Sequence, residues 1–145
     1  MNTEIEILLA EDKQSDAEMT IRAIRKNRVQ NKITHVTDGK AVLDFLFGEG
    51  KFLGRDTSNQ PRFILLDLKM PKLNGIEVLK RIRENDLTKT IPVVVLTSSK
   101  EDPDIEQCYL LGVNSYIVKP VVFEDFMKVV SDVGLYWILH NQPPL

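Results

Sequence analysis

Three carboxylates in this sequence stand at the ends of apolar runs that have the length of a β-strand. Glu11 and Asp12 follow residues 5–10, and Asp67 closes residues 63–67. Such a run is typical of a strand buried on both faces of a parallel sheet, and its carboxyl end opens into the crevice where α/β proteins bind ligands. Converging carboxylates repel one another unless a cation joins them, and Mg²⁺ prefers such oxygen ligands. We therefore expect a Mg²⁺ site here.

Two further polar residues follow strand-like runs. Thr97 comes after residues 93–96, and Lys119 comes after residues 115–118. A hydroxyl and an ammonium suit phosphoryl oxygens, and a carboxylate can itself attack phosphorus to give an acyl phosphate. Asp67 is the expected nucleophile because it lies centrally among the others. Taken singly, each residue has an ordinary structural explanation, such as a turn residue or a solvated charge, but their joint position at four strand ends favours a functional site.

Stretches with helical period alternate with the apolar runs, which predicts βαβ units and a parallel sheet with five strands and five helices. Ser15 or Asp16 is the expected cap of the first helix, and Asp38 with Gly39 is expected to open the second. For the fourth helix, Asp102-Pro103-Asp104 is a strong start signal. The last helix is expected from about Val122 to Asn141. The expected strands are residues 5–10, 32–36, 63–67, 93–96 and 115–118.

Length and composition narrow the class of protein. The chain has 145 residues, which suits a single domain, and a formal net charge of −2, which makes nucleic acid an unexpected direct partner. It contains no apolar stretch long enough to span a membrane and leaves no room for a signal peptide before the first strand, so a cytoplasmic location is expected. The single cysteine, Cys108, is expected to be a core or interface residue without a chemical role.

Taken in order, these motifs resemble those of two-component response regulator receiver domains. The resemblance covers nearly the whole chain. It rests on Glu11-Asp12, on Asp67 with Met70-Pro71 and Asn74-Gly75, on Thr97, and on the segment from Tyr116 to Pro120. It implies a flavodoxin-like (βα)5 three-layer sandwich with the parallel strand order 2-1-3-4-5.

The same resemblance implies a mechanism. Asp67 would accept a phosphoryl group from a phosphohistidine of a sensor histidine kinase, so the chain would be a signalling protein that assists its own phosphorylation and dephosphorylation rather than an enzyme. Thr97 and Lys119 would hold the phosphoryl oxygens, Tyr116 would follow Thr97 inward as an aromatic switch, and the Lys119-Pro120 bond would be cis. The implied Mg²⁺ ligands are Glu11, Asp12, Asp67 and the backbone carbonyl of Lys69.

Three rival readings fit the motifs less well. A phosphatase or mutase with an aspartate nucleophile needs a general acid two residues further on, where this chain has Lys69. A flavin or nucleotide binder of the same fold would need a phosphate-binding loop after the first strand, where residues 11–14 would instead repel phosphate unless a metal intervened. An adaptor that is never phosphorylated would be expected to lack one of the acidic or lysine positions, and none is lacking.

A narrower resemblance concerns the loop 48–61 and the tail from about 136 to 145. Both are similar to those of single-domain regulators that serve bacterial phytochrome-type kinases and tend to form dimers. The predicted organisation is one receiver domain over residues 1–145 with that tail at its C-terminal end. A homodimer is expected through the surface of the fourth helix, fifth strand and fifth helix. Apolar residues expected at this interface are Tyr109, Leu110, Tyr136, Trp137, Ile138 and Leu139.

Overall fold

Five parallel strands form one sheet in the computed structural model, which describes residues 6–26 and 32–134. Their order in the sheet is β2-β1-β3-β4-β5, so the predicted flavodoxin-like order is confirmed. The predicted strand ranges are confirmed to within one residue. The strands are β1 (Glu6–Ala10), β2 (Lys32–Val36), β3 (Phe63–Asp67), β4 (Val93–Thr97) and β5 (Ser115–Val118).

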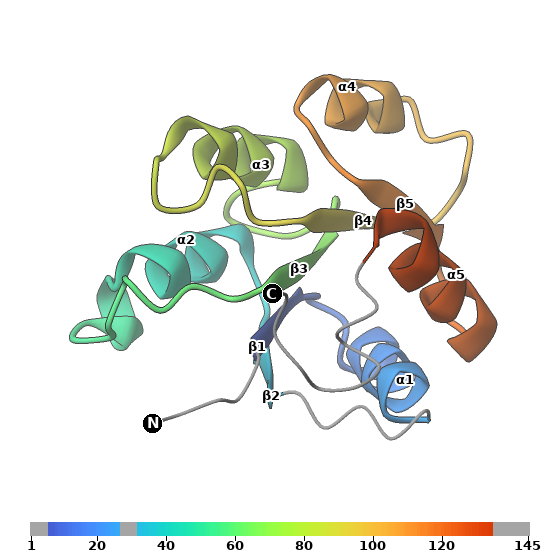
Figure 1. Cartoon of the computed structure of the whole chain (residues 1–145), viewed down its shortest axis with the longest axis horizontal. Helices are drawn as coiled ribbons and strands as arrows, with labels where there is room; N and C mark the ends of the chain where they lie inside the picture. The colour runs from blue at the N-terminus through green and yellow to red at the C-terminus, as the bar shows by residue number, and fades with distance from the viewer. Residues whose placement is uncertain (1–5, 27–31, 135–145) are drawn as a thin grey trace.

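Helices cover both faces of this sheet (Figure 1). Helices α1 and α5 pack on one face, and α2, α3 and α4 pack on the other. This three-layer arrangement follows from right-handed crossovers between parallel strands. The helices are α1 (Gln14–Arg25), α2 (Gly39–Phe47), α3 (Gly75–Glu84), α4 (Asp104–Leu110) and α5 (Phe123–Val133), with a short 3-10 helix, η1 (Gly50–Phe52), after α2.

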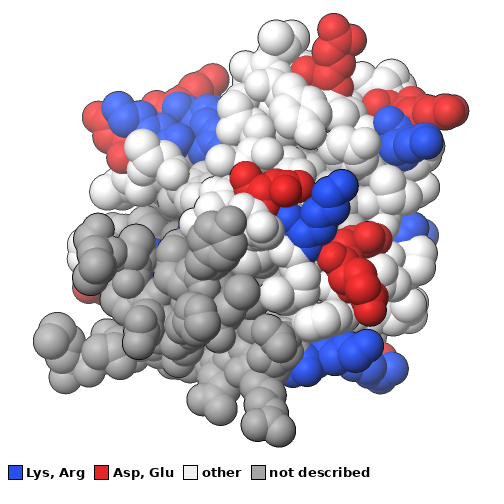
Figure 2. Space-filling view, turned by 45° about the vertical axis from the view of Figure 1, so that its right-hand side comes forward, with Lys and Arg blue, Asp and Glu red and all other residues white. Residues whose placement is uncertain are grey.

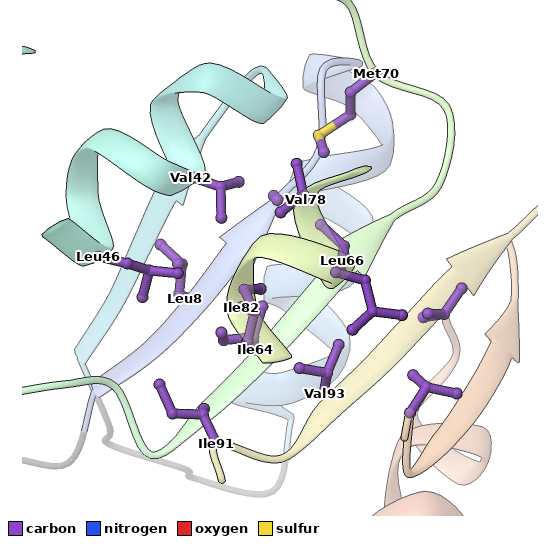
Figure 3. Close-up of a cluster of buried hydrophobic side chains, with 14 of the residues drawn as sticks. Leu8, Val42, Leu46, Ile64, Leu66, Met70, Val78, Ile82, Ile91 and Val93 are labelled. Atoms are coloured by element: carbon purple, nitrogen blue, oxygen red, sulfur yellow. The ribbon is translucent and has the colours of Figure 1, made fainter. Parts of the chain in front are cut away.

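Alternate residues of each central strand enter opposite cores. Leu8, Ile64 and Val93 point toward α2 and α3, as Figure 3 shows for the larger cluster. Ile7 and Leu65, their neighbours in β1 and β3, point toward α1 and α5. Every residue of β3 and β4 is buried. The continuous apolar runs in the sequence are therefore explained by burial on two faces.

The register of the sheet brings the strand ends to one level. Ala10 of β1 lies opposite Leu66 of β3, so Glu11 is level with Asp67 at the edge. On the other side of β3, Asp67 itself lies opposite Leu96. Thr97 follows directly and lies opposite Val118, the residue before Lys119. The residues with the expected chemistry thus project from adjacent strand ends.

The turn after β3 has a specific need for glycine. Asn74 caps α3 by accepting a hydrogen bond from the Glu77 N–H at 3.0 Å, and the Gly75 N–H donates to the Leu68 carbonyl at 2.9 Å. A Cβ at Gly75 would lie 2.7 Å from Cα of Leu68 and 2.8 Å from the carbonyl oxygen of Asp67. Only glycine therefore allows the first turn of α3 to approach the end of β3 so closely.

The prediction that Ser15 or Asp16 caps the first helix is wrong. Helix α1 begins at Gln14 with Lys13 as its N-cap, and no side chain caps it. The carboxylate of Asp16 pairs instead with Lys119, at 3.2 Å. At α2 the prediction is confirmed, because Asp38 accepts a hydrogen bond from the Ala41 N–H at 2.7 Å. An ion pair across the sheet edge has thus replaced the local cap expected for α1.

Helix α4 begins at its predicted start signal, whereas α5 ends before its predicted end. Pro103 occupies the cap position of α4, and Asp102 still accepts a hydrogen bond from the Asp104 N–H at 2.9 Å. Helix α5 ends at Val133, because Gly134 adopts a left-handed conformation with φ of 80°. The predicted extension toward Asn141, including the aromatic cluster 136–139, lies outside the described residues.

The described surface has a mixed charge. Figure 2 shows acidic and basic side chains interspersed on the face turned to the viewer, without a continuous basic area over its described part. Cys108 is buried, with 1% of its surface exposed, which confirms its expected place in the core. Among the residues described, no helix is both long enough and apolar enough to cross a membrane.

Candidate functional site

Carboxylates from β1 and β3 meet at the edge of the sheet. One oxygen atom from each of Glu11, Asp12 and Asp67 lies within 4.8 Å of the others. Glu11 has no exposed surface and Asp67 is 3% exposed, whereas Asp12 is exposed to solvent. Buried carboxylates are rare unless they are paired or bind a cation. This cluster therefore needs positive charge.

Lys119 supplies part of that charge from the end of β5. Its Nζ lies 3.3 Å from Oδ2 of Asp67, 3.3 Å from Oε1 of Glu11 and 3.2 Å from Oδ2 of Asp16. The Lys119 N–H also donates to the Thr97 carbonyl at 2.7 Å, and the peptide bond from Lys119 to Pro120 is cis, as the resemblance implies. One ammonium thus joins three carboxylates from separate segments of the chain.

Burial and charge shift the ionisation of these groups. Burial, with the hydrogen bond and negative charge of Asp67, raises the pKa of Glu11 to about 8, and Lys119 offsets only part of this rise. Burial alone would lower the pKa of Lys119, but the attraction of Asp67 and Glu11 raises it above its usual value. Lys119 therefore remains a cation, while Glu11 holds a proton more tightly than an exposed glutamate.

The oxygen donors fit a hard divalent cation. Three carboxylates within reach of one ion match the preference of Mg²⁺ and Mn²⁺ for oxygen ligands. A cation would also offset the two effects that raise the pKa of Glu11, which are its burial and the negative charge of Asp67. The Lys69 N–H donates to Oδ1 of Asp67 at 3.1 Å. That the Lys69 carbonyl binds the ion stays a prediction.

Thr97 lies at the end of β4 and is 2% exposed. Its Oγ1 is 3.1 Å from the Ser99 carbonyl and 3.1 Å from Oδ2 of Asp102, and either can accept its proton. Tyr116 is half-buried in the neighbouring strand β5, and its ring meets that of Tyr109 edge to face, with 6.4 Å between centroids. Thr97 thus contacts the loop before α4, and Tyr116 contacts α4 itself.

A cavity of about 110 Å³ lies beside Asp67 and is lined by Thr97 and Lys119 among others. Sequence reasoning missed three residues of this region: Asp16, Lys13 and Asp102. The first two lie at the start of the helix that follows β1, and a helix after a parallel strand begins at the same edge where ligands bind. For Asp102, the sequence indicated only that a helix starts nearby.

The chain is similar to known proteins over nearly its whole length. The family model described as the response regulator receiver domain matches residues 7–131. The chain is 40% identical over 141 residues to the probable methanogenesis regulatory protein FilR2 of Methanothrix harundinacea, covering 95% of this chain and 86% of that protein. It is 36% identical over 132 residues to the response regulator Rcp1 of Synechocystis, covering 91% and 88%.

Solved structures give the same result. The bacteriophytochrome response regulator RtBRR superposes with a TM-score of 0.87 at 45% identity, over 97% of this chain and 84% of that one. The phosphorylated cyanobacterial phytochrome response regulator RcpA has a TM-score of 0.76 at 33% identity, over 93% and 94%. For the Mn²⁺-bound form of Rcp1, the TM-score is 0.77 at 33% identity, over 97% and 99%.

Proposed function

The chain belongs to the response regulator receiver domain family, whose members are phosphorylated on an aspartate in two-component signalling, and we propose that Asp67 is this aspartate here. The observation that carries the proposal is the placement of Asp67. Its carboxylate is level with Glu11, paired with Lys119 and open to a cavity large enough for a small anion. Asp12, the exposed carboxylate of the cluster, has no such cation beside it among the interactions of the described residues.

In the proposed step, a carboxylate oxygen of Asp67 forms a bond with phosphorus. The bond between phosphorus and the imidazole nitrogen of the donor histidine breaks, and the electron pair stays on that nitrogen, which takes up a proton. Lys119 then pairs with a phosphoryl oxygen, and the Thr97 hydroxyl donates to another. Such transfer depends mainly on positioning and on stabilising charge, which these side chains provide.

Mg²⁺ is the proposed cofactor, held by Glu11, Asp12 and Asp67 and, as the resemblance implies, by the carbonyl of Lys69. The oxygen donor set and the Mn²⁺-bound form of the relative Rcp1 support this assignment. When bound, the ion supplies positive charge that offsets the carboxylates and the incoming phosphoryl group. Glu11 must then lose its proton, which couples metal binding to pH.

We further propose that the phosphoryl donor is a sensor histidine kinase of the phytochrome type. Support comes from the names of the similar proteins, because RtBRR is a bacteriophytochrome response regulator and RcpA a phytochrome response regulator. Both match more than nine-tenths of this chain. FilR2, whose name refers to methanogenesis, is the main reason to test the donor directly.

The proposed output is a change in the surface formed by α4, β5 and α5, which we call the 4-5-5 surface. If the Thr97 hydroxyl moves toward the phosphoryl group, it vacates space that the Tyr116 ring can take, giving a two-state element that phosphorylation biases. Leu110 on α4 is 82% exposed and Tyr109 is 47% exposed. Exposed apolar area of this kind supports a homodimer through the same surface.

Incubation of the purified chain with acetyl phosphate and Mg²⁺, followed by intact-mass measurement, tests the proposed function. One phosphoryl group should be added, and excess chelator should abolish the addition. The variant Asp12→Asn should slow it at low Mg²⁺ and recover at higher Mg²⁺, because it loses one metal ligand but keeps the acceptor. Phosphorylation at the same rate in chelator would show that the transfer does not require a metal ion.

A further inference from the structure

One carboxylate connects Thr97 with the beginning of helix α4. Oδ2 of Asp102 lies 3.1 Å from Oγ1 of Thr97, and Oδ1 of the same side chain accepts a hydrogen bond from the Asp104 N–H at 2.9 Å. Asp104 is the first residue of α4. Any movement of the Thr97 hydroxyl therefore changes the hydrogen bonding of a side chain that also binds the first residue of this helix.

The Thr97 hydroxyl has one proton to donate. Within the described part of the chain, the hydrogen-bond partners of its oxygen are Asp102 and Ser99, and neither is Asp67. A carboxylate is the stronger acceptor of the two available, because charge-assisted hydrogen bonds are shorter and stronger than neutral ones. In this state the hydroxyl is therefore committed to the loop after β4, although Thr97 lines the same cavity as Asp67 and Lys119.

We propose that Asp102 is a positioning residue, which holds the Thr97 hydroxyl in the unphosphorylated protein and transmits its release to α4. This inference rests on the proposed phosphorylation of Asp67. A phosphoryl oxygen and Oδ2 of Asp102 compete for one proton, so phosphorylation breaks the hydrogen bond to Asp102. The Asp102 carboxylate then loses one of its two partners, and the first turn of α4 is freed from β4.

The route from Asp102 to the output surface is short. Helix α4 is only seven residues long, from Asp104 to Leu110. Its residue Tyr109 contacts the ring of Tyr116, with 6.4 Å between the ring centroids. A displaced start of α4 therefore alters the packing against the aromatic ring that would move toward Thr97. Asp102 thus acts on the first residue of α4, and Tyr116 acts on Tyr109 near the end of the same helix.

The test measures phosphorylation rates of the 145-residue chain with acetyl phosphate and Mg²⁺ in four proteins: wild type, Asp102→Asn, Thr97→Val and the double variant. In Asp102→Asn the amide oxygen can still accept the hydrogen bond from the Asp104 N–H, but the amide nitrogen cannot accept the hydroxyl proton. Its rate should exceed that of the wild type by about fivefold, as expected for loss of one competing hydrogen bond of ordinary strength.

The Thr97→Val background distinguishes positioning from simple charge removal. Without the hydroxyl, Asp102→Asn should leave the rate unchanged, so the two substitutions should be strongly non-additive. Glu101→Gln removes an exposed carboxylate one residue away and should match the wild type. A fivefold higher rate in both backgrounds would mean that Asp102 acts only by its charge. An unchanged rate in the wild-type background would mean that Asp102 does not restrain the Thr97 hydroxyl. Either result overturns the proposal.

A second measurement follows the signal into the helix. In amide NMR spectra, phosphorylation should shift the Asp104 signal in the wild type and leave it in place in Thr97→Val, because no hydroxyl then leaves Asp102. An equal shift in both proteins would contradict the relay. Failure of the wild type to take up a phosphoryl group at all would instead overturn the proposed function, so the two failures are distinguishable.

Discussion

Nζ of Lys119 lies 3.3 Å from Oδ2 of Asp67, although the two residues are 52 positions apart in the sequence. Strand β4 separates the strands to which they belong, so the contact depends on the parallel order β3-β4-β5 and on its register. The contact places an ammonium beside the proposed acceptor before any phosphoryl group arrives. This positive charge is therefore already in position when the chain has folded, and it needs no rearrangement during phosphoryl transfer.

Substitution of Thr97 by alanine should separate phosphorylation from its output. Thr97→Ala should still accept a phosphoryl group, because Asp67 and Lys119 are intact. Allosteric coupling usually changes an affinity by about 5- to 150-fold. If phosphorylation changes the dimer constant of the wild type by such a factor, the variant should lose most of that change. Sedimentation of phosphorylated and unphosphorylated protein measures the dimer constant. Thr97→Ser keeps the hydroxyl and should respond like the wild type, whereas a full response in Thr97→Ala would refute the switch.

Mg²⁺ binding should strengthen with pH. Because burial and Asp67 raise the pKa of Glu11 to about 8, this group adds stability to the metal-free fold below pH 4.5 and loses it as pH rises toward 8. Mg²⁺ must displace the proton, so its affinity should rise by about tenfold per pH unit below that value. Calorimetric titration between pH 6 and 8 measures the slope. Glu11→Gln should flatten it, and equal wild-type affinity across this range would contradict the protonated Glu11.

Substitution of Gly75 by alanine should destabilise the fold. The new methyl group would lie 2.7 Å from Cα of Leu68, and α3 would have to move away from the end of β3. Such overpacking against backbone typically costs about 1–3 kcal/mol. Chemical denaturation of Gly75→Ala measures the cost, with Glu84→Ala on the exposed side of the same helix as its control. A stability equal to that of the control would contradict the close approach.

The exposed apolar residues of α4 should contribute to self-association. Leu110→Ser should weaken the homodimer by about 1–2 kcal/mol, roughly tenfold in the dimer constant, if Leu110 lies in the interface. Leu53 is equally exposed, at 82%, but it follows η1, which contacts α2, and α2 lies far from α4 (Figure 1), so Leu53→Ser should have no effect. The sequence alone predicts that Trp137 lies in the interface, so Trp137→Ala should weaken the dimer by about 2 kcal/mol or more. A wild type that stays monomeric at high micromolar concentration would rule out the homodimer.

The apolar runs were sufficient to predict the sheet, because strands buried on both faces leave an unambiguous pattern. They also predicted that Glu11, Asp12 and Asp67 meet at one edge, and their oxygens lie within 4.8 Å of one another. Helix starts were less predictable. Asp16 looks like a cap in sequence, but its carboxylate pairs with Lys119, a residue 103 positions away. Such a long-range ion pair has no signature in local sequence.

The position of Asp102 shows the same limit in another way. Its sequence context, followed by Pro103, correctly indicates a helix start, and the side chain does accept a hydrogen bond from Asp104. Its second contact, with Thr97, depends on how the loop after β4 folds back over the strand end. Hydrophobic periodicity carries no information on such loops. For such residues the sequence predicts the hydrogen bond to a nearby residue, and the structure reveals the second hydrogen bond to a distant strand end.

The identity of the acceptor residue is the central claim, and reductive trapping tests it most directly. An acyl phosphate is reduced by borohydride to an alcohol, so a phosphorylated aspartate becomes homoserine and can be located by peptide mass mapping. After treatment with acetyl phosphate and Mg²⁺, we expect homoserine at position 67 and nowhere else, and none in Asp67→Asn. Conversion at Asp12 instead, or an unchanged phosphorylation rate in Asp67→Asn, would contradict the account.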